Sequence, residues 1–84
     1  MFDGVSAEPS PEAVAEASEL RTRIHDALAD LQEPYRSIVI FREIQDMKYD
    51  EISESLELPL NTVKSYLHRG RRMLREKLSE ALDT

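Results

Sequence analysis

Basic and polar side chains recur in the last third of the chain at a spacing that gathers them on one face of a helix. The candidates for contacts with base edges are Asn61, Lys64, Ser65 and His68. At about 100° per residue, they lie opposite an apolar stripe made of Val63, Leu67, Gly70 and Leu74, with Leu78 at its edge. Amide, ammonium, hydroxyl and imidazole groups can hydrogen-bond to phosphates and to base edges in a major groove. The pattern therefore predicts a helix that packs on one side and contacts nucleic acid on the other.

A second set of residues is suited to contacts with the phosphate backbone, which fix the register of a protein on a duplex. It consists of Lys48, Tyr49, Thr62, Arg69, Arg72 and Arg75. For each of these sets the alternative is a merely solvated helix face, and Tyr49 and Tyr66 are also suited to half-buried packing. Arg71 lies nearer the apolar edge, where it can pair with an acidic residue of another helix.

The preceding residues supply the element that would position this helix. Residues 49–56 form a short helical pattern with Ile52 and Leu56 as an i, i+4 apolar pair. Glu57 and Leu58 then lead to Pro59, whose fixed φ suits the first turn of a helix. A connection this short lets the second helix cross the first at a steep angle. Residues 49–78 thus predict a helix-turn-helix, with Asn61 and Thr62 at the N-terminus of the recognition helix.

The whole chain reads as an all-α, four-helix bundle-like domain. Residues 1–9 are small, polar and aperiodic, which is typical of a flexible linker. Ser10-Pro11 is a helix start, so we expect helices over about 11–31, 34–45, 49–56 and 60–81. No strand-like alternation or internal repeat is found. The residues predicted to be buried are Leu20, Ile24, Leu28, Ile38, Ile44, Ile52, Leu56, Val63, Leu67 and Leu74.

The net charge of −6 argues against nucleic acid until its distribution is considered. Residues 1–58 hold five basic and fourteen acidic residues, a net charge of −9, whereas residues 59–84 hold six and three, a net charge of +3. Because the local charge governs binding, the recognition helix keeps its attraction for phosphate. The acidic half indicates a second, different surface.

Several function classes find no support in the composition. The 84 residues contain no cysteine, and His25 is the only histidine besides His68, so no metal or other cofactor is expected. No set of nucleophile, base and orienting group stands at a telling spacing, which argues against an enzyme with a small-molecule substrate. Without a long apolar run or a signal-peptide pattern, the chain is expected to be cytoplasmic and not to enter a membrane.

Four stretches carry a family resemblance, namely 34–36 (PYR), 41–44 (FREI), 49–52 (YDEI) and 59–71 (PLNTVKSYLHRGR). Through them the chain from Leu31 to Leu82 resembles region 4 of bacterial sigma factors, the extracytoplasmic-function group above all. The stretch 59–71 is the most specific, because the family shows a Pro-x-x-Thr-Val-Lys-Ser-x-Leu-His-Arg-Ala/Gly-Arg run there. The resemblance implies binding of the −35 promoter element, docking on the β flap of core RNA polymerase, and an anti-sigma factor as a further partner.

Four positions depart from the family pattern. Glu57 replaces a glycine, at a cost on the order of 1 kcal/mol if its backbone is left-handed. Lys48 replaces a serine N-cap worth about 1 kcal/mol. Asn61 and Tyr66 replace a common glycine and a common arginine, which bears on base preference more than on the fold. The sigma domain that binds the −10 element is not in this sequence, so we expect either an excised domain or a standalone relative.

Two alternatives stay open at this point. One is a protein-binding module that keeps the sigma fold but contacts an anti-sigma factor instead of DNA, which the acidic first half favours and the basic helix face disfavours. The other is a helix-turn-helix regulator of the quorum-sensing type, which would bind a palindrome as a two-fold dimer.

Overall fold

Residues 10–82 form four α-helices and one π-helical segment. The computed structural model describes the backbone of residues 10–82 and the side chains of residues 10–80, so the predicted linker at residues 1–9 lies outside the described residues. The elements are α1 (Pro11–Ala29), α2 (Tyr35–Val39), the π-helical η2 (Ile40–Ile44), α3 (Tyr49–Leu56) and α4 (Leu60–Leu82). No strand occurs between residues 10 and 82. The expected all-α class is confirmed, with the boundaries of α3 as predicted.

Local chemistry explains where the helices begin and end. Ser10 caps α1 by accepting a hydrogen bond from the Ala13 amide at 3.1 Å, and Pro11 opens the helix. Helix α3 has only half of a capping box: the Glu51 carboxylate accepts from the Lys48 amide at 2.8 Å, while the Lys48 side chain has no acceptor to offer. The loss of the side-chain cap at Lys48 was expected from the sequence.

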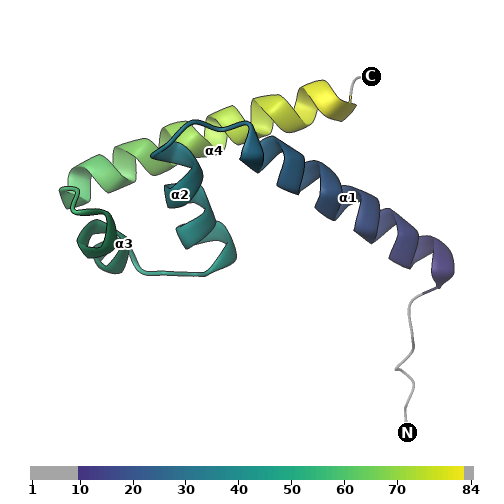
Figure 1. Cartoon of the computed structure of the whole chain (residues 1–84), viewed down its shortest axis with the longest axis horizontal. Coiled ribbons are helices and arrows are strands. Elements are labelled where there is room, and N and C mark those ends of the chain that lie inside the picture. The colour runs from purple at the N-terminus through teal and green to yellow at the C-terminus, as the bar shows by residue number, and fades with distance from the viewer. Residues whose placement is uncertain (1–9, 83–84) are drawn as a thin grey trace, which may run out of the picture.

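Helix α4 is the longest helix of the described residues, and the other elements pack along it (Figure 1). Helix α2 packs under its middle, and α3 lies beside its N-terminal end, with the tight turn between them. Helix α1 contacts α4 near its own C-terminal end and then diverges from it. The α3–turn–α4 unit is the predicted helix-turn-helix.

The core lies where these helices converge. The buried hydrophobic residues of the described chain are Ala27, Leu28, Leu31, Ile38, Val39, Ile52, Val63 and Leu67. Leu56 and Leu74 are half-buried at its edge, as is Ile24. The stripe of α4 predicted to pack does so, because Val63, Leu67 and Gly70 are all buried.

Two of the predicted core residues are exposed instead. Leu20 is 52% exposed because it belongs to the part of α1, residues 11–23, in which every side chain is exposed; this helix packs against the fold only near its C-terminal end. Ile44 is 58% exposed and lies in η2, where the Gln45 amide bonds to the Ile40 carbonyl. An i→i−5 bond widens the turn, so the 100° spacing used to assign Ile44 to the core does not hold there.

The connection between α1 and α2 is held by one arginine and one glutamate. Arg36 donates from Nη1 to the Ala29 carbonyl at 3.2 Å, capping α1, and from Nε to Glu33 at 3.0 Å. Glu33 also accepts from the hydroxyl and the amide of Ser37, at 2.6 and 3.2 Å. The hydrogen bond from the Ser37 hydroxyl is the main cause that holds the pKa of Glu33 below its ordinary value. Desolvation acts in the opposite direction, and the Ser37 amide and Arg36 add to the lowering.

Candidate nucleic-acid interface

The turn between α3 and α4 sets the angle at which the recognition helix leaves the fold. Glu57 adopts a left-handed backbone, with φ 55° and ψ 46°, at the C-terminus of α3. The Leu58 amide bonds to the Ser53 carbonyl at 3.0 Å, and the Ser53 hydroxyl bonds to the Leu58 carbonyl, so the ends of the turn are tied together. The conditional cost assigned to Glu57 from the sequence therefore applies, because a Cβ atom is disfavoured in this region.

The four residues predicted to contact base edges lie together on the exposed side of α4. They are Asn61, Lys64, Ser65 and His68, and all four side chains are exposed. They occupy the first turns of a helix whose opposite side is held in the core by Val63 and Leu67. Their assignment as base contacts stays a prediction, for which this geometry gives a suitable surface.

The predicted phosphate contacts fall into two groups. Lys48, Arg72 and Arg75 are exposed, and Thr62 is half-buried at the start of α4. Tyr49 is half-buried, with the Arg42 guanidinium 5.4 Å from its ring centroid. Arg42 also donates to the Met47 carbonyl at 3.0 Å and to Asp46 at 3.1 Å, so it ties the loop before α3 together. Tyr49 therefore has the half-buried packing that was the alternative for it, and its contact with a phosphate stays a prediction.

Arg69 and Arg71 hold α4 against the helices beneath it. Arg69 donates from Nη1 to the Tyr35 hydroxyl in α2 at 3.0 Å. Arg71 forms an ion pair with Glu43 in η2, in which Nε donates to Oε2 at 2.7 Å. The suggested pairing of Arg71 with an acid of another helix is thus confirmed.

The pairing with Arg71 changes how Glu43 can be interpreted. The acidic first half of the chain predicts a surface separate from the DNA face, and Glu43 and Asp46 are acidic positions at which a charge reversal could test it. Glu43 instead supports the recognition helix directly, so a charge reversal at this position would disturb both surfaces. Asp46 also bonds to an arginine, but Arg42 belongs to the preceding η2 segment and not to α4, and the Asp46 side chain is 91% exposed, so Asp46 is the better probe.

Tyr35 also lies at this interface, although residue spacing gave no reason to assign it there. Its ring packs edge-on against that of Tyr66, with centroids 5.2 Å apart and planes at 62°. Its hydroxyl meets Arg69, which is 34 residues later in the sequence. No spacing rule relates residues so far apart, so no signal in the sequence would have found this contact.

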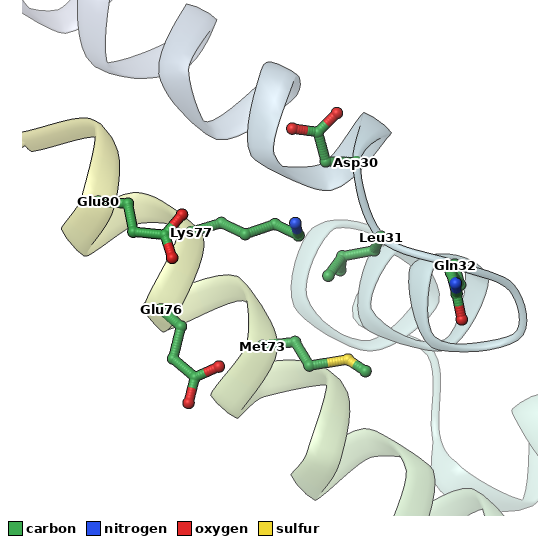
Figure 2. Close-up of a pocket in the computed structure, with 7 residues that line it drawn as sticks. All are labelled: Asp30, Leu31, Gln32, Met73, Glu76, Lys77 and Glu80. Atoms are coloured by element: carbon green, nitrogen blue, oxygen red, sulfur yellow. The ribbon is translucent and has the colours of Figure 1, made fainter.

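A shallow pocket lies beside α4 on the side of the α1–α2 connection (Figure 2). It has a volume of about 280 Å³, and Lys77 and Met73 extend from α4 toward Leu31. Its lining mixes Lys77 with the carboxylates of Asp30, Glu76 and Glu80. Within the described residues, no group of histidine, cysteine or acidic side chains is arranged to hold a metal ion. None of the helices in residues 10–82 is both long and apolar enough to cross a membrane.

Comparison with known proteins gives a consistent result. Residues 21–74 match the family model "Sigma-70, region 4". The chain is 38% identical over 80 residues to the ECF RNA polymerase sigma factor SigE of Mycolicibacterium smegmatis, covering 94% of this chain and 31% of that protein. It is 34% identical over 70 residues to the ECF RNA polymerase sigma factor SigW of Bacillus subtilis, covering 83% and 37%.

A third relative, the ECF RNA polymerase sigma-E factor of Haemophilus influenzae, is 30% identical over 69 residues, covering 82% of this chain and 36% of that protein. The chain therefore spans about a third of the length of these relatives. The match to the family model covers the helix-turn-helix up to Leu74, together with α2, η2 and part of α1. The chain belongs to the sigma-70 region 4 family, and ECF RNA polymerase sigma factors are among its relatives.

Proposed function

We propose that this chain acts in transcription initiation by binding the −35 promoter element in the major groove through α4. The observation that carries the proposal is the exposure of Asn61, Lys64, Ser65 and His68 on one side of a helix whose other side is buried. A helix presented in this way by a helix-turn-helix can enter a major groove with its N-terminal residues at the base edges. Membership of the sigma-70 region 4 family supports the same conclusion.

The roles proposed for the side chains follow from their positions on α4. Lys64 is the residue best placed to read a guanine edge, since lysine and arginine are the usual partners of guanine O6 and N7. Arg72 and Arg75, further along the helix and exposed, are proposed to bind phosphates. Because the rest of the chain is acidic, binding by the isolated chain should be weak and should fall steeply with salt.

The proposed partners are promoter DNA, the β flap of core RNA polymerase and an anti-sigma factor, all in the bacterial cytoplasm and without a catalytic role for this chain. Two relatives are named as RNA polymerase sigma factors, which supports core RNA polymerase as a partner. The net charge of −9 over residues 1–58 supports a protein contact away from the DNA face. Asp46→Lys should then weaken polymerase binding while it leaves DNA affinity nearly unchanged, in separate pull-down and DNA titrations.

DNA titrations of variants test the central proposal. A duplex selected by the chain from a random library, and a scrambled duplex, are titrated at two salt concentrations by fluorescence anisotropy. Lys64→Ala should cost about 1–3 kcal/mol on the selected duplex and relax discrimination at one base pair, whereas Arg72→Ala should weaken both duplexes and lower the salt slope by about one. Arg23→Ala on α1, where the arginine is exposed, is the matched control for loss of a positive charge.

Unchanged affinities in Lys64→Ala on both duplexes would contradict the assignment of α4 as the recognition helix and would favour the protein-binding alternative. The stoichiometry on the selected duplex decides the remaining alternative. One chain per site is expected for a sigma domain, whereas two chains on a palindrome would indicate a dimeric regulator.

A further inference from the structure

Arg69 differs from the other basic residues that we propose to contact DNA, because it is already bonded to another helix. Its Nη1 donates to the Tyr35 hydroxyl at 3.0 Å, and its Cζ lies 6.0 Å from the Tyr35 ring centroid. That distance is at the outer limit for a cation–π contact, so the hydrogen bond is the main interaction. Within the described residues, Lys64, Arg72 and Arg75 show no side-chain hydrogen bond to another helix.

The tyrosine is itself held in place by α4. Its ring packs edge-on against Tyr66, with centroids 5.2 Å apart, and Tyr66 precedes Arg69 by three residues on the same helix. Tyr35 is half-buried, whereas Arg69 is exposed. Tyr35, whose ring is packed against Tyr66, therefore holds the guanidinium end of the exposed Arg69 side chain.

The chemistry of the partner decides what this contact does to the arginine. Arg71, two residues later, is paired with the carboxylate of Glu43, so its charge is offset within the protein. Arg69 is held by a neutral phenol, which leaves its positive charge in place, and a guanidinium has five donors of which this bond uses one. Arg69 thus stays free to bind an anion, and Arg71 has its charge already matched.

We propose that Tyr35 is a positioning residue for DNA binding, whose hydroxyl holds Arg69 ready to contact a backbone phosphate. The proposal rests on the proposed function of α4. A long side chain normally loses rotamer freedom when it is immobilised at an interface. Because the hydrogen bond to Tyr35 already restricts Arg69, part of that loss occurs before DNA binds.

Removal of the hydroxyl tests the proposal. Tyr35→Phe keeps the ring packed against Tyr66 and should weaken binding to both the selected and the scrambled duplex by about three- to tenfold, the range expected when one side chain must be ordered on binding. Tyr66→Phe is the matched control, since no hydrogen bond from its hydroxyl occurs in the described structure. It should leave DNA affinity unchanged. Thermal unfolding followed by circular dichroism should give the same midpoint for both variants as for the unchanged chain.

A double-mutant cycle separates positioning from a structural role. Arg69→Ala should lower the salt slope by about one, and Tyr35→Phe should have no further effect in that background. Arg71→Ala should reduce the unfolding midpoint but leave the salt slope unchanged, because the charge of Arg71 is matched by Glu43.

Three results would overturn the proposal. Tighter binding by Tyr35→Phe would show that the tyrosine withholds Arg69 from DNA. Unchanged affinity in Tyr35→Phe, with Arg69→Ala still weakened, would show that Arg69 acts without it. An equal effect of Tyr35→Phe in the presence and absence of Arg69 would show a role independent of the arginine. Failure of the proposed function itself is distinguishable, because it requires that Lys64→Ala and Arg72→Ala leave DNA binding unchanged.

Discussion

The backbone of Gly70 in α4 lies directly against the side chain of Val39 in α2. A Cβ atom at Gly70 would come within 2.8 Å of Val39 Cγ2 and 3.5 Å of the Tyr35 carbonyl oxygen. On either side of this contact, Arg69 bonds to Tyr35 and Arg71 to Glu43. Three consecutive residues in the middle of α4 therefore contact the elements packed against it, and among them only Gly70 brings the helix backbone into close contact with a buried side chain.

The first prediction concerns the contact between Gly70 and Val39. Helix propensity alone would make Gly70→Ala stabilising by about 1 kcal/mol. We expect it instead to be destabilising, by roughly 1–2 kcal/mol, because the added methyl group meets a β-branched side chain with one strongly preferred rotamer in a helix. Chemical denaturation measures the change. In a Val39→Ala background, where space has been made, Gly70→Ala should become neutral or stabilising, and a destabilisation of the same size there would contradict the assigned cause.

The second prediction compares one substitution at two leucines. Leu67 is 1% exposed in the core, and Leu20 is 52% exposed on α1. Leu67→Ala should lower the free energy of unfolding by roughly 2–5 kcal/mol through a cavity, whereas Leu20→Ala should change it by less than about 0.5 kcal/mol. Urea unfolding of both variants tests this, and equal effects would show that the buried side of α4 is wrongly identified.

The third prediction concerns the left-handed residue in the turn. Glu57→Gly should raise the free energy of unfolding by about 1 kcal/mol, because glycine has no Cβ to be crowded at a positive φ. Glu54→Gly is the matched control, since Glu54 is exposed within α3. It should instead lower stability by about 1 kcal/mol. Thermal melts at one pH are sufficient, and a loss of stability in both variants would mean that Glu57 is not left-handed in solution.

The fourth prediction is a dependence of stability on pH. The pKa of Glu33 is lowered in the fold, chiefly by the Ser37 hydroxyl. A carboxyl group with a lowered pKa stabilises the fold above its unfolded-state pKa, and this contribution disappears as the pH falls through the folded-state pKa. Glu33→Gln should therefore be less stable than the unchanged chain at neutral pH and should lose less stability in acid.

Unfolding midpoints from neutral pH into the acid range measure the effect of Glu33→Gln. Glu54→Gln serves as the control, because the Glu54 side chain forms no hydrogen bond with the described residues. Parallel pH profiles for Glu33→Gln and the unchanged chain would be inconsistent with the lowered pKa.

Sequence patterns predicted best the parts of the fold that depend on local chemistry. The boundaries of α3, the start of α4 at Leu60 and the packed stripe from Val63 to Gly70 follow from proline, turn residues and helical periodicity. The periodicity placed Leu20 in the core because it cannot show that this part of α1 diverges from α4. It also misplaced Ile44, because the sequence carries no signal for the π-helical bond from Gln45 to Ile40.

The candidate site shows the same division. The residues on the exposed face of α4 could be predicted from their spacing, because the apolar stripe identifies the buried side and the exposed side lies opposite to it. The attachments of that helix could not, because Tyr35 and Glu43 come from earlier elements and meet arginines 34 and 28 residues later. Arg71 was expected to find an acidic partner, but the identity of the partner depends on the crossing of two helices, which only the three-dimensional arrangement shows.

Because α1 diverges from α4, its two ends are stabilised differently: the C-terminal turns by packing in the core, and the N-terminal turns only by local helical interactions. From Pro11 to Asp26 no residue is buried, whereas Ala27 and Leu28, just before the end of the helix, belong to the core. Short helical segments without tertiary packing are marginal in water, even with a good N-cap such as Ser10. The N-terminal turns of α1 should therefore behave as a local helix–coil equilibrium, in which backbone hydrogen bonds open at a much lower free energy than global unfolding. The last turns should open only together with the helix-turn-helix.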